Sequence, residues 1–288
     1  MRSSLLWLVP VALVWSHAVA DGGWKAEKET RTLKVTASAG QPLKVSTRNG
    51  GVTVVQGTTD QMVVTAELYA KTKDDLAKIE IEASNDSDNG SAVHVKFPDP
   101  KQMSNMGCAL TIEMPRAKGV TIEAKNGPIE ISEMAGKAVL ETSNGPVIIR
   151  NHDGSVVVET SNAPVEASDV TGAVAIETSN GPVEVNLHES ASEKFVIQTS
   201  NAPVEVRVPR AFNGILGVET SNGNISFPSE SDITKKPGNR GYGDVSGQAT
   251  FGKGGPVCTI ETSNGPVQIR YRGEQDGEPK QRKKPSTH

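Results

Sequence analysis

The chain has 288 residues, of which only 4% are aromatic, and its formal net charge is −4 at neutral pH. This mild acidity argues against nucleic acid as a partner, because proteins that bind nucleic acid usually present a strongly basic surface. The sequence contains no nucleophile elbow, Walker loop or zinc signature, so it offers no recognisable motif for those chemistries.

Residues 1–20 have the features of a secretory signal peptide. Arg2 gives a basic start, residues 5–15 are apolar, and Ala18, Val19 and Ala20 form a small-residue cleavage site. The apolar run is too short to span a bilayer, and no other long apolar run follows, so no transmembrane segment is predicted. The mature protein is therefore predicted to lie in the periplasm, on the cell surface or outside the cell.

Residues 21–30 are predicted to be a loose polar leader, and a single domain is predicted over 31–271. Its first part, 31–115, is expected to form irregular first coils with one hairpin or excursion. Residues 74–81 suit a short helix or the approach to a strand. Alternating apolar residues predict strands at 33–36, 43–47, 52–55, 62–70, 92–97 and 109–114.

Residues 119–227 form a regular array built on one heptapeptide, which reads Glu-Thr-Ser-Asn-Gly-Pro-Val at 141–147. Successive motif asparagines are 18 or 21 residues apart up to Asn222, and the last lies 42 residues further on. A fixed short period is typical of a repeat architecture. Close copies stand at 159–165, 177–183, 198–204, 219–225 and 261–267, and looser ones at 46–52 and 123–129.

Each repeat predicts two short strands, because apolar residues alternate on both sides of the Ser-Asn-Gly-Pro step. Asparagine tolerates left-handed backbone and proline fixes φ, so this step should form a structural corner. Ala163 and Ala202 replace the glycine in two copies, so we expect the slot to require a small residue. The corner asparagines are Asn126, Asn144, Asn162, Asn180, Asn201, Asn222 and Asn264.

One strand pair cannot bury its own apolar face, but stacked repeats can, with like strands pairing in parallel. The predicted fold is therefore an all-β, single-domain parallel β-solenoid, or β-helix. Each coil has 18–21 residues and two short strands, and a right-handed coil is preferred. Residues 228–257 should hold a diverged coil and a loop, and 258–271 the last coil, which closes the array. The charged residues 272–288 are predicted to be disordered.

The phased motif, with its extended lead at 33–36 and the segments 43–47 and 51–54, resembles a known bacterial family. This family consists of secreted or envelope proteins catalogued as a candidate adhesin domain of unknown function. The resemblance covers 31–271. It implies a β-solenoid fold, export and a role at the cell envelope or in adhesion. It supplies no catalytic residues.

Two columns of glutamates are the candidate binding face. Glu141, Glu159 and Glu177 occupy one outward column, while Glu166 and Glu184 belong to a second column across the corner. Such a row could recruit Ca²⁺ or a cationic partner through its carboxylate oxygens. The alternative is a solvated face that keeps the strands soluble. No other cofactor and no metal site is predicted.

The remaining candidates have simpler interpretations. His152 and His188 should share a column two coils apart, too far for one metal, and are expected to be surface histidines. Cys108 and Cys258 are expected to be two buried thiols, since several coils should separate them. A disulfide is the alternative for an exported pair.

Three functions fit these observations. The first is a non-enzymatic envelope or surface protein whose repeated faces bind a polymer or another protein. The second is a polysaccharide lyase or hydrolase, which would need an acid–base cluster in one groove, set apart from the repeat. The third, ice binding on a threonine array, is disfavoured because Thr142, Thr160 and Thr178 have inward parity.

Overall fold

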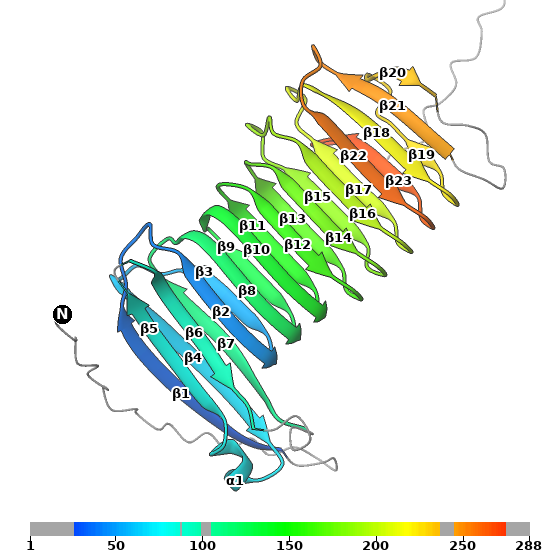
Figure 1. Cartoon of the computed structure of the whole chain (residues 1–288). Helices are drawn as coiled ribbons and strands as arrows, with labels where there is room; N and C mark the ends of the chain where they lie inside the picture. Colours follow the sequence, from blue (N-terminus) through cyan, green and yellow to red (C-terminus); the bar gives the residue numbers. More distant parts are fainter. Residues whose placement is uncertain (1–25, 87, 99–104, 237–244, 275–288) are drawn as a thin grey trace, which may run out of the picture.

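The structure is a computed structural model that describes residues 26–86, 88–98, 105–236 and 245–274 (Figure 1). The predicted signal peptide and the part of the predicted tail beyond residue 274 lie outside these residues. The prediction of an all-β fold is confirmed, because the described residues form two large sheets and one short helix, α1 (Lys73–Leu76). Nowhere in the described ranges is there a helix of the length and apolar character that a membrane span requires.

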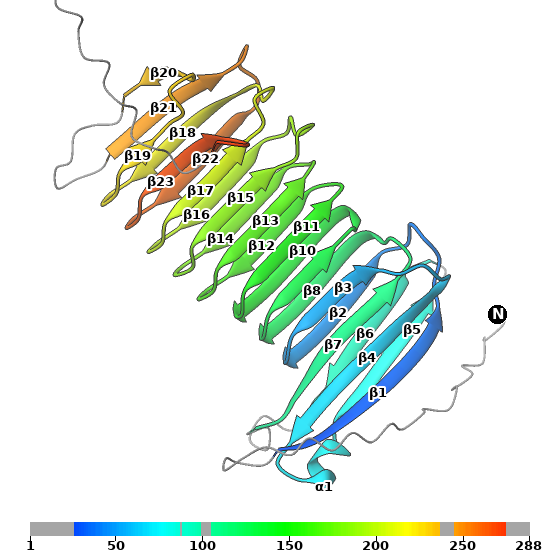
Figure 2. The same ribbon diagram turned by 180° about the vertical axis from the view of Figure 1, so that it is seen from behind.

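The two sheets lie face to face and enclose the buried side chains between them (Figure 1, Figure 2). Sheet A contains, in spatial order, β1 (Glu27–Thr36), β4 (Gln61–Ala70), β7 (Gly107–Met114), β3 (Val52–Gln56), β9 (Ile129–Ser132), β11 (Val147–His152), β13 (Val165–Val170), β15 (Val183–Leu187), β17 (Val204–Val208), β23 (Val267–Tyr271) and β19 (Ile225–Ser226). Sheet B contains, in the opposite direction, β20 (Asp232–Lys235), β21 (Val245–Phe251), β18 (Gly214–Thr220), β22 (Val257–Thr262), β16 (Phe195–Thr199), β14 (Val174–Thr178), β12 (Val156–Thr160), β10 (Ala135–Asn144), β8 (Lys118–Asn126), β2 (Leu43–Asn49), β6 (Gly90–Lys96) and β5 (Glu80–Asp86).

Equivalent residues of neighbouring repeats pair with each other in the central part of both sheets. In sheet B, Glu159 pairs with Glu141 on one side and with Glu177 on the other, and all of β12 follows this parallel register. In sheet A, β13 pairs in the same way with β11 and β15. The spacing of the motif in the sequence thus equals the step from one strand to the next.

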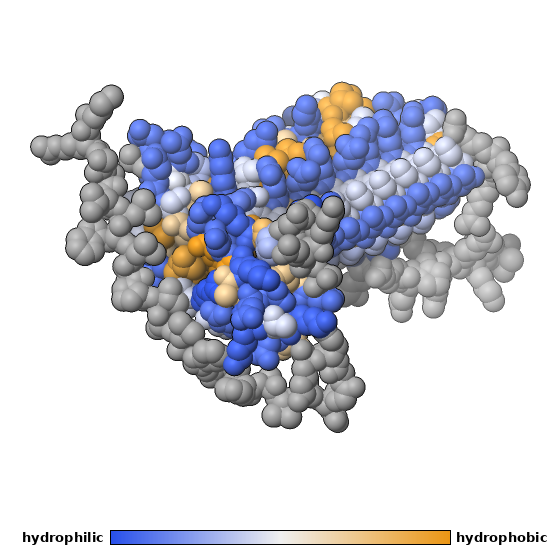
Figure 3. Space-filling model, turned by 60° about the horizontal axis from the view of Figure 1, so that its bottom comes forward, coloured by the Kyte–Doolittle hydropathy of each residue, from blue (hydrophilic) through white to orange (hydrophobic). Residues whose placement is uncertain are grey.

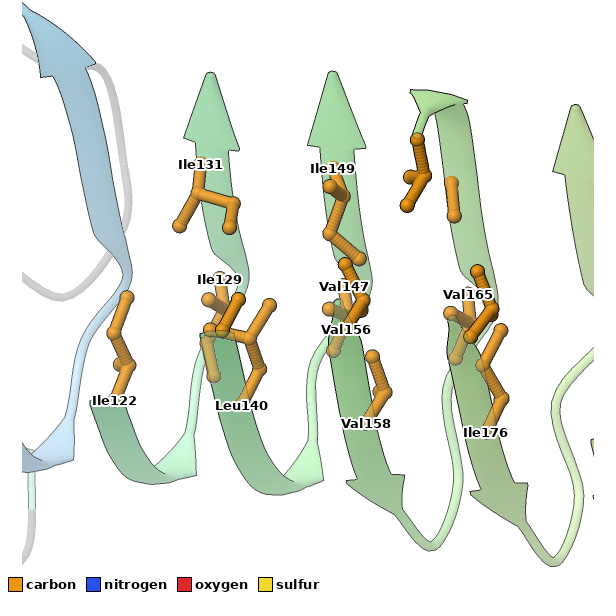
Figure 4. Packing of buried hydrophobic residues seen from close by; sticks show 14 of the residues in the cluster. Ile122, Ile129, Ile131, Leu140, Val147, Ile149, Val156, Val158, Val165 and Ile176 are labelled. Carbon is orange, nitrogen blue, oxygen red and sulfur yellow. The ribbon is translucent and has the colours of Figure 1, made fainter. Parts of the chain in front are cut away.

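The core lies between the sheets, where every second residue of each strand points inward. Figure 4 shows Leu140, Val158 and Ile176 of sheet B beside Val147 and Val165 of sheet A, and each of these side chains is at most 3% exposed. Burying one such side chain stabilises the fold by about 1.5–3 kcal/mol. A long row of modest aliphatic residues can therefore hold the sheets together with few aromatics.

The corner asparagines form one continuous ladder of side-chain hydrogen bonds. Each Nδ2 donates to the Oδ1 of the asparagine in the neighbouring repeat. The donor–acceptor distances are 2.8 Å for Asn126–Asn49, 3.0 Å for Asn144–Asn126, 3.2 Å for Asn162–Asn144, 2.9 Å for Asn180–Asn162, 2.9 Å for Asn201–Asn180, 2.8 Å for Asn264–Asn201 and 2.9 Å for Asn222–Asn264. At the far end, Asn49 donates to the carbonyl oxygen of Met106 at 3.3 Å, which fixes the direction of every amide.

The motif glycine is required by close backbone approach. A Cβ on Gly145 would lie 2.0 Å from the carbonyl oxygen of Gly127 in the neighbouring repeat. Ala163 and Ala202, which occupy the same slot in two repeats, are 3% exposed and do not have positive φ. In the regular copies the slot therefore needs a small residue rather than left-handed backbone, as the alanines indicate, whereas Gly50 and Gly127 in the two looser copies have φ of 132° and 144°.

The stacking order differs from the order of the repeats in the chain. The strand pair β22–β23 lies between the pairs β16–β17 and β18–β19 (Figure 1). The prediction that 258–271 closes the array is therefore wrong. At the other end, β2–β3 lies between β6–β7 and β8–β9 in the same manner. The copies share the residues that set the register, so the motif by itself does not indicate this order.

Both ends of the stack are covered by antiparallel strands. At the C-terminal end, β21 pairs antiparallel with β18, and β20 with β21. Within the predicted diverged segment 228–257, the described strands β20 and β21 thus form an antiparallel cover instead of a diverged coil. At the other end, β1 pairs antiparallel with β4 from Glu27 onward, so it begins inside the predicted leader 21–30. Such pairing satisfies edge groups that would otherwise bind other chains.

Aromatic residues gather under the C-terminal cover. The rings of Phe195, Phe212, Phe251 and Tyr271 form a series with centroid separations of 6.0, 6.1 and 6.0 Å. Just beyond them, Arg272 donates to Asp169 at 2.7 Å and to the carbonyl oxygen of Leu187 at 2.6 Å. The predicted disordered tail therefore cannot begin at residue 272, because this arginine is anchored.

Candidate binding face

One outward column of sheet B is almost entirely acidic. Residue-for-residue pairing places its members on consecutive strands, about 4.8 Å apart. All of them are exposed, and the salt bridges of the described residues include none of them. In spatial order the column is Glu123, Glu141, Glu159, Glu177, Gln198, Glu261 and Glu219.

In the equivalent column of sheet A, three of the glutamates pair with arginines, while Glu166 is in none of the salt bridges of the described residues. Arg150 pairs with Glu130, and Arg207 pairs with Glu184 and, at 2.7 Å, with Glu205. Each arginine stands two residues beyond the column position of its own strand, which is Ile148 in β11 and Glu205 in β17, so both arginines face the same side as the column. Sheet A therefore presents alternating charge, whereas the acidic column of sheet B makes no salt bridge within the described residues, and an exposed lysine, Lys125, lies two residues beyond Glu123 at one end of it.

The five glutamates predicted as one face lie on two opposite surfaces. Glu141, Glu159 and Glu177 point outward from sheet B, whereas Glu166 and Glu184 point outward from sheet A. The structure does not bring the two sets together. Within the described ranges no group of three or more His, Cys, Asp or Glu side chains could hold a metal ion. The arrangement suits contact with an extended cationic surface better than the enclosure of one ion.

Other columns flank the acidic one on sheet B. Val139, Val157, Ala175 and Val196 form a half-buried apolar row on one side. A serine row, beginning at Ser143, runs on the other side. Figure 3 shows side chains of similar hydropathy in straight rows along the stack. A polymer lying along this face would meet apolar, acidic and hydroxyl groups at each step.

A groove of about 460 Å³ interrupts this face near its C-terminal end. Its wall on one side is Val245 and Ser246, at the start of the cover strand β21. Its floor consists of the Glu or Gln, Thr and Ser positions of β14, β16, β22 and β18, including Glu177, Glu261 and Glu219. Sequence reasoning missed this groove, because nothing in the repeat indicates that an antiparallel strand would follow β18.

The inward threonines are buried, as their parity predicts. Thr142 and Thr178 are 3% exposed and Thr160 is 8% exposed. These side chains are therefore not available as an outward array for ice.

His152 is not the surface histidine that was predicted. It is 1% exposed, and its Nε2 lies 2.9 Å from the carbonyl oxygen of Gly136. Burial lowers the pKa of this imidazole. Its column continues through Val170 and Leu187 instead of His188, so the predicted shared column is wrong.

The reason for this misassignment is the second corner of each repeat. Glu133, Asn151 and Asp169 occur 18 residues apart and have φ of 60°, 52° and 56°. A left-handed residue there breaks the strict alternation that places side chains inward or outward. In β13 the pairing register shifts between Ser168 and Val170, across Asp169.

Cys108 and Cys258 are both free and buried, as predicted. Burial raises the pKa of Cys108 to about 12 and also raises the pKa of Cys258. Cys108 lies in β7 and Cys258 in β22, near opposite ends of the stack. They are structural thiols and cannot bridge in this fold.

These features define an all-β protein of stacked parallel strands with one exposed column of glutamates that makes no salt bridge within the described residues. Residues 144–274, which are 131 of the 288 residues, match a family model described as a domain of unknown function (DUF7330). The predicted resemblance to a domain-of-unknown-function family is confirmed over that stretch. None of the curated proteins matches the chain.

Several solved structures are similar to the chain. A candidate cell adhesion protein from Clostridium sporogenes is 11% identical with a TM-score of 0.31, and the match covers 86% of this chain and 100% of that one. A candidate adhesin from Bacteroides fragilis is 10% identical with a TM-score of 0.32, over 84% and 96%. A candidate adhesin from Parabacteroides distasonis is 11% identical with a TM-score of 0.39, over 83% and 96%.

Proposed function

We propose that this protein is an exported, non-enzymatic, adhesin-like β-solenoid whose repeated faces bind a polymer or protein of the cell envelope. In this proposal 31–271 is one domain of 18–21-residue coils with two strands each. The basic start, apolar run and cleavage site of 1–20 support export. The parallel register and the asparagine ladder support the coil.

The acidic column of sheet B carries the proposal. Neighbouring carboxylates about 4.8 Å apart repel each other by roughly 1 kcal/mol in water before screening. On sheet A arginines pair with Glu130, Glu184 and Glu205, whereas the salt bridges of the described residues include none of the sheet B glutamates from Glu123 to Glu219. A cationic partner that repeats along the face would relieve it at every step. We therefore assign sheet B as the binding face and an amine-bearing polymer or a basic protein surface as its partner.

The enzymatic alternative has weaker support. The groove beside β21 contains carboxylates from Glu177, Glu261 and Glu219, as a hydrolase would need. These glutamates are members of the periodic column, not a cluster set apart from it. The described residues that line this groove include no lysine or arginine, which a uronate lyase would need to hold its substrate.

Polymer binding with charge-matched variants tests the proposal. The mature chain would be titrated with a soluble glucosamine polymer, which is cationic, and with a galacturonate polymer, which is anionic. The triple variant Glu141→Gln/Glu159→Gln/Glu177→Gln removes charge from sheet B. The control Glu166→Gln/Glu184→Gln/Glu205→Gln removes the same charge from sheet A.

We expect the wild type to bind the glucosamine polymer, and added salt to weaken binding. Three exposed ion pairs of about 0.2–1 kcal/mol each predict a loss of about tenfold for the sheet B variant. The sheet A variant should bind nearly as the wild type does. Equal losses in both variants would show a general charge effect and contradict the assignment. Release of unsaturated uronate from the galacturonate polymer would favour the enzymatic alternative.

A further inference from the structure

The strand pair β22–β23 occupies a slot inside the stack, although it is the last element of the chain that the structure describes. On one side β22 pairs with β16 over Val196↔Thr259 to Thr199↔Thr262. On the other side it pairs with β18 over Ile215↔Val257 to Thr220↔Thr262. The two neighbouring pairs, β16–β17 and β18–β19, are consecutive in the chain, and the later pair β22–β23 lies between them.

Two motif copies have the sequence that this slot requires for its strand register. The motif at 261–267 and that at 219–225 share their first five residues, Glu-Thr-Ser-Asn-Gly. In β22, Glu261 pairs with Gln198 on one side and with Glu219 on the other. Asn264 likewise lies in the asparagine ladder between Asn201 and Asn222. If β22–β23 left the slot, β18–β19 could therefore pair with β16–β17 in the same register. Withdrawal of β22–β23 would expose that strand pair, and the remaining pairs of the stack could still hydrogen-bond to one another.

A short glycine-rich segment precedes the inserted pair. Between the end of β21 at Phe251 and the start of β22 lie residues 252–256, which read Gly-Lys-Gly-Gly-Pro. Gly252, Gly254 and Gly255 have φ of 57°, 79° and 158°, values that other residues rarely adopt. A segment of this composition can redirect the chain that follows it, as a hinge does.

We propose that Val257–Tyr271 is an exchangeable strand pair that can fill the slot of a second copy of this chain. In the second copy, the donated strand pair would form the same backbone pairs and the same Asn264 hydrogen bonds as it forms within its own chain. Cys258 would be buried in the same way. Exchange of identical elements therefore changes the free energy little, apart from the new conformation of the hinge and the translational and rotational entropy lost on association. Tyr271 against Phe251, and Arg272 against Asp169, hold the pair in place and make exchange slow. This proposal is independent of the proposed binding face.

Disulfide trapping between two different chains tests the exchange. Gln198 and Glu261 are register partners across the edge of the slot, and their side chains meet at 3.2 Å. Two single variants, Gln198→Cys and Glu261→Cys, would each be made in a Cys258→Val background, so that the native thiol of β22 does not interfere, while Cys108 stays buried near the other end of the stack. They would be mixed at high concentration, incubated and oxidised, and covalent mixed dimers would be measured on a non-reducing gel.

The matched control is the mixture of Glu159→Cys and Glu177→Cys in the same background. These residues are also register partners on the same face, but β12 and β14 adjoin each other in the continuous array. The proposal predicts severalfold more mixed dimer from the slot pair than from the control pair. Equal yields would overturn it, because random collisions would then explain both.

A double variant, Gln198→Cys/Glu261→Cys in one chain, checks the geometry. It should oxidise to an intramolecular disulfide at low concentration, because register partners on adjacent strands lie within the reach of this bond. Failure to oxidise would contradict the insertion of β22 beside β16, and the proposal would fall with it.

Discussion

Replacing Asn162 with aspartate should reveal how much the asparagine ladder contributes to stability. Asn162 donates from Nδ2 to Asn144 at 3.2 Å and accepts from Asn180 at 2.9 Å. An ionised carboxylate can still accept from Asn180, but it cannot donate to Asn144. Flipping the amides beyond it would not repair the ladder, because Asn49 donates to the backbone carbonyl of Met106 at the far end.

The expected magnitude follows from one lost bond and one altered bond. A typical hydrogen bond contributes about 0.5–1.5 kcal/mol net, and the lost bond leaves two acceptors facing each other. The bond from Asn180 becomes charge-assisted and offsets part of this loss. Because the ladder is exposed, water can hydrogen-bond to the unpaired groups, which further reduces the loss of stability. We expect Asn162→Asp to lower the free energy of unfolding by about 1–2 kcal/mol at neutral pH.

The loss should depend on pH. In the folded state the ladder favours the neutral carboxyl, which can both donate and accept, so its pKa should rise above the ordinary value of about 3.9. The Asn162→Asp variant should thus be destabilised to the greatest extent at pH values above the pKa that this carboxyl has in the folded state. This destabilisation should shrink as pH falls through the folded pKa toward the unfolded value. Asn162→Ala loses both bonds and should show a difference from wild type that does not depend on pH.

Urea unfolding of the three proteins, followed by circular dichroism, would measure these differences at neutral and at acidic pH. A second probe must give the same transition, because stacked repeats can unfold in parts. Ser161→Ala, at the exposed neighbouring position, should change stability by less than about 0.5 kcal/mol. The reasoning is refuted if the aspartate variant is as stable as wild type at neutral pH, or if its deficit is unchanged in acid.

Three further predictions concern burial and close packing. The lowered pKa of buried His152 means that its folded state holds the neutral ring, so wild-type stability should fall as pH drops below about 6.5. His152→Leu, which matches Leu187 in the same column, should flatten this dependence in urea titrations, and an unchanged slope would contradict the assignment. Gly145→Ala should lower the free energy of unfolding by about 1–3 kcal/mol, because its Cβ would meet the Gly127 oxygen at 2.0 Å. Ala163→Gly is its control, with a change below about 1 kcal/mol in the same unfolding assay. The buried thiols of Cys108 and Cys258 should react slowly with a thiol reagent at neutral pH and fully in denaturant, and rapid native labelling of Cys108 would contradict its burial.

The repeat determines the register of the strands, and the sequence was sufficient to predict it. Motif spacing aligned Glu141 with Glu159 and Glu177, and these residues pair as expected. Inward parity likewise predicted the burial of Thr142. Periodicity predicts such features because each residue meets its own equivalent in the next strand.

The order of the strands could not be predicted, because nearly identical copies fit the same slot equally well. The sequence of 261–267 fits beside β16 and beside β18, and nothing within the motif selects one arrangement. The antiparallel cover at β21 was missed for a related reason, since its pairing with β18 is non-local and outside the period.

The candidate site was predicted residue by residue but not as a surface. The acidic columns were found, but the arginines that pair with glutamates of only one of them were not assigned to either face. Arg150 and Arg207 belong to sheet A, and that placement makes the two faces different. The burial of His152 was missed because a left-handed residue at Asn151 changes parity, and asparagine there gives only a weak signal.

Distances between spin labels on the acidic face test the central claim most directly, namely that equivalent residues stack in one file in the order of the structure. Glu123 is five strands from Glu261 and six from Glu219 in this order. At about 4.8 Å per strand, labels at 123 and 261 should lie about 24 Å apart, and labels at 123 and 219 about 29 Å apart. A shorter distance for the second pair would show that the repeats stack in chain order. Equal or widely scattered distances would show that they do not stack in one file.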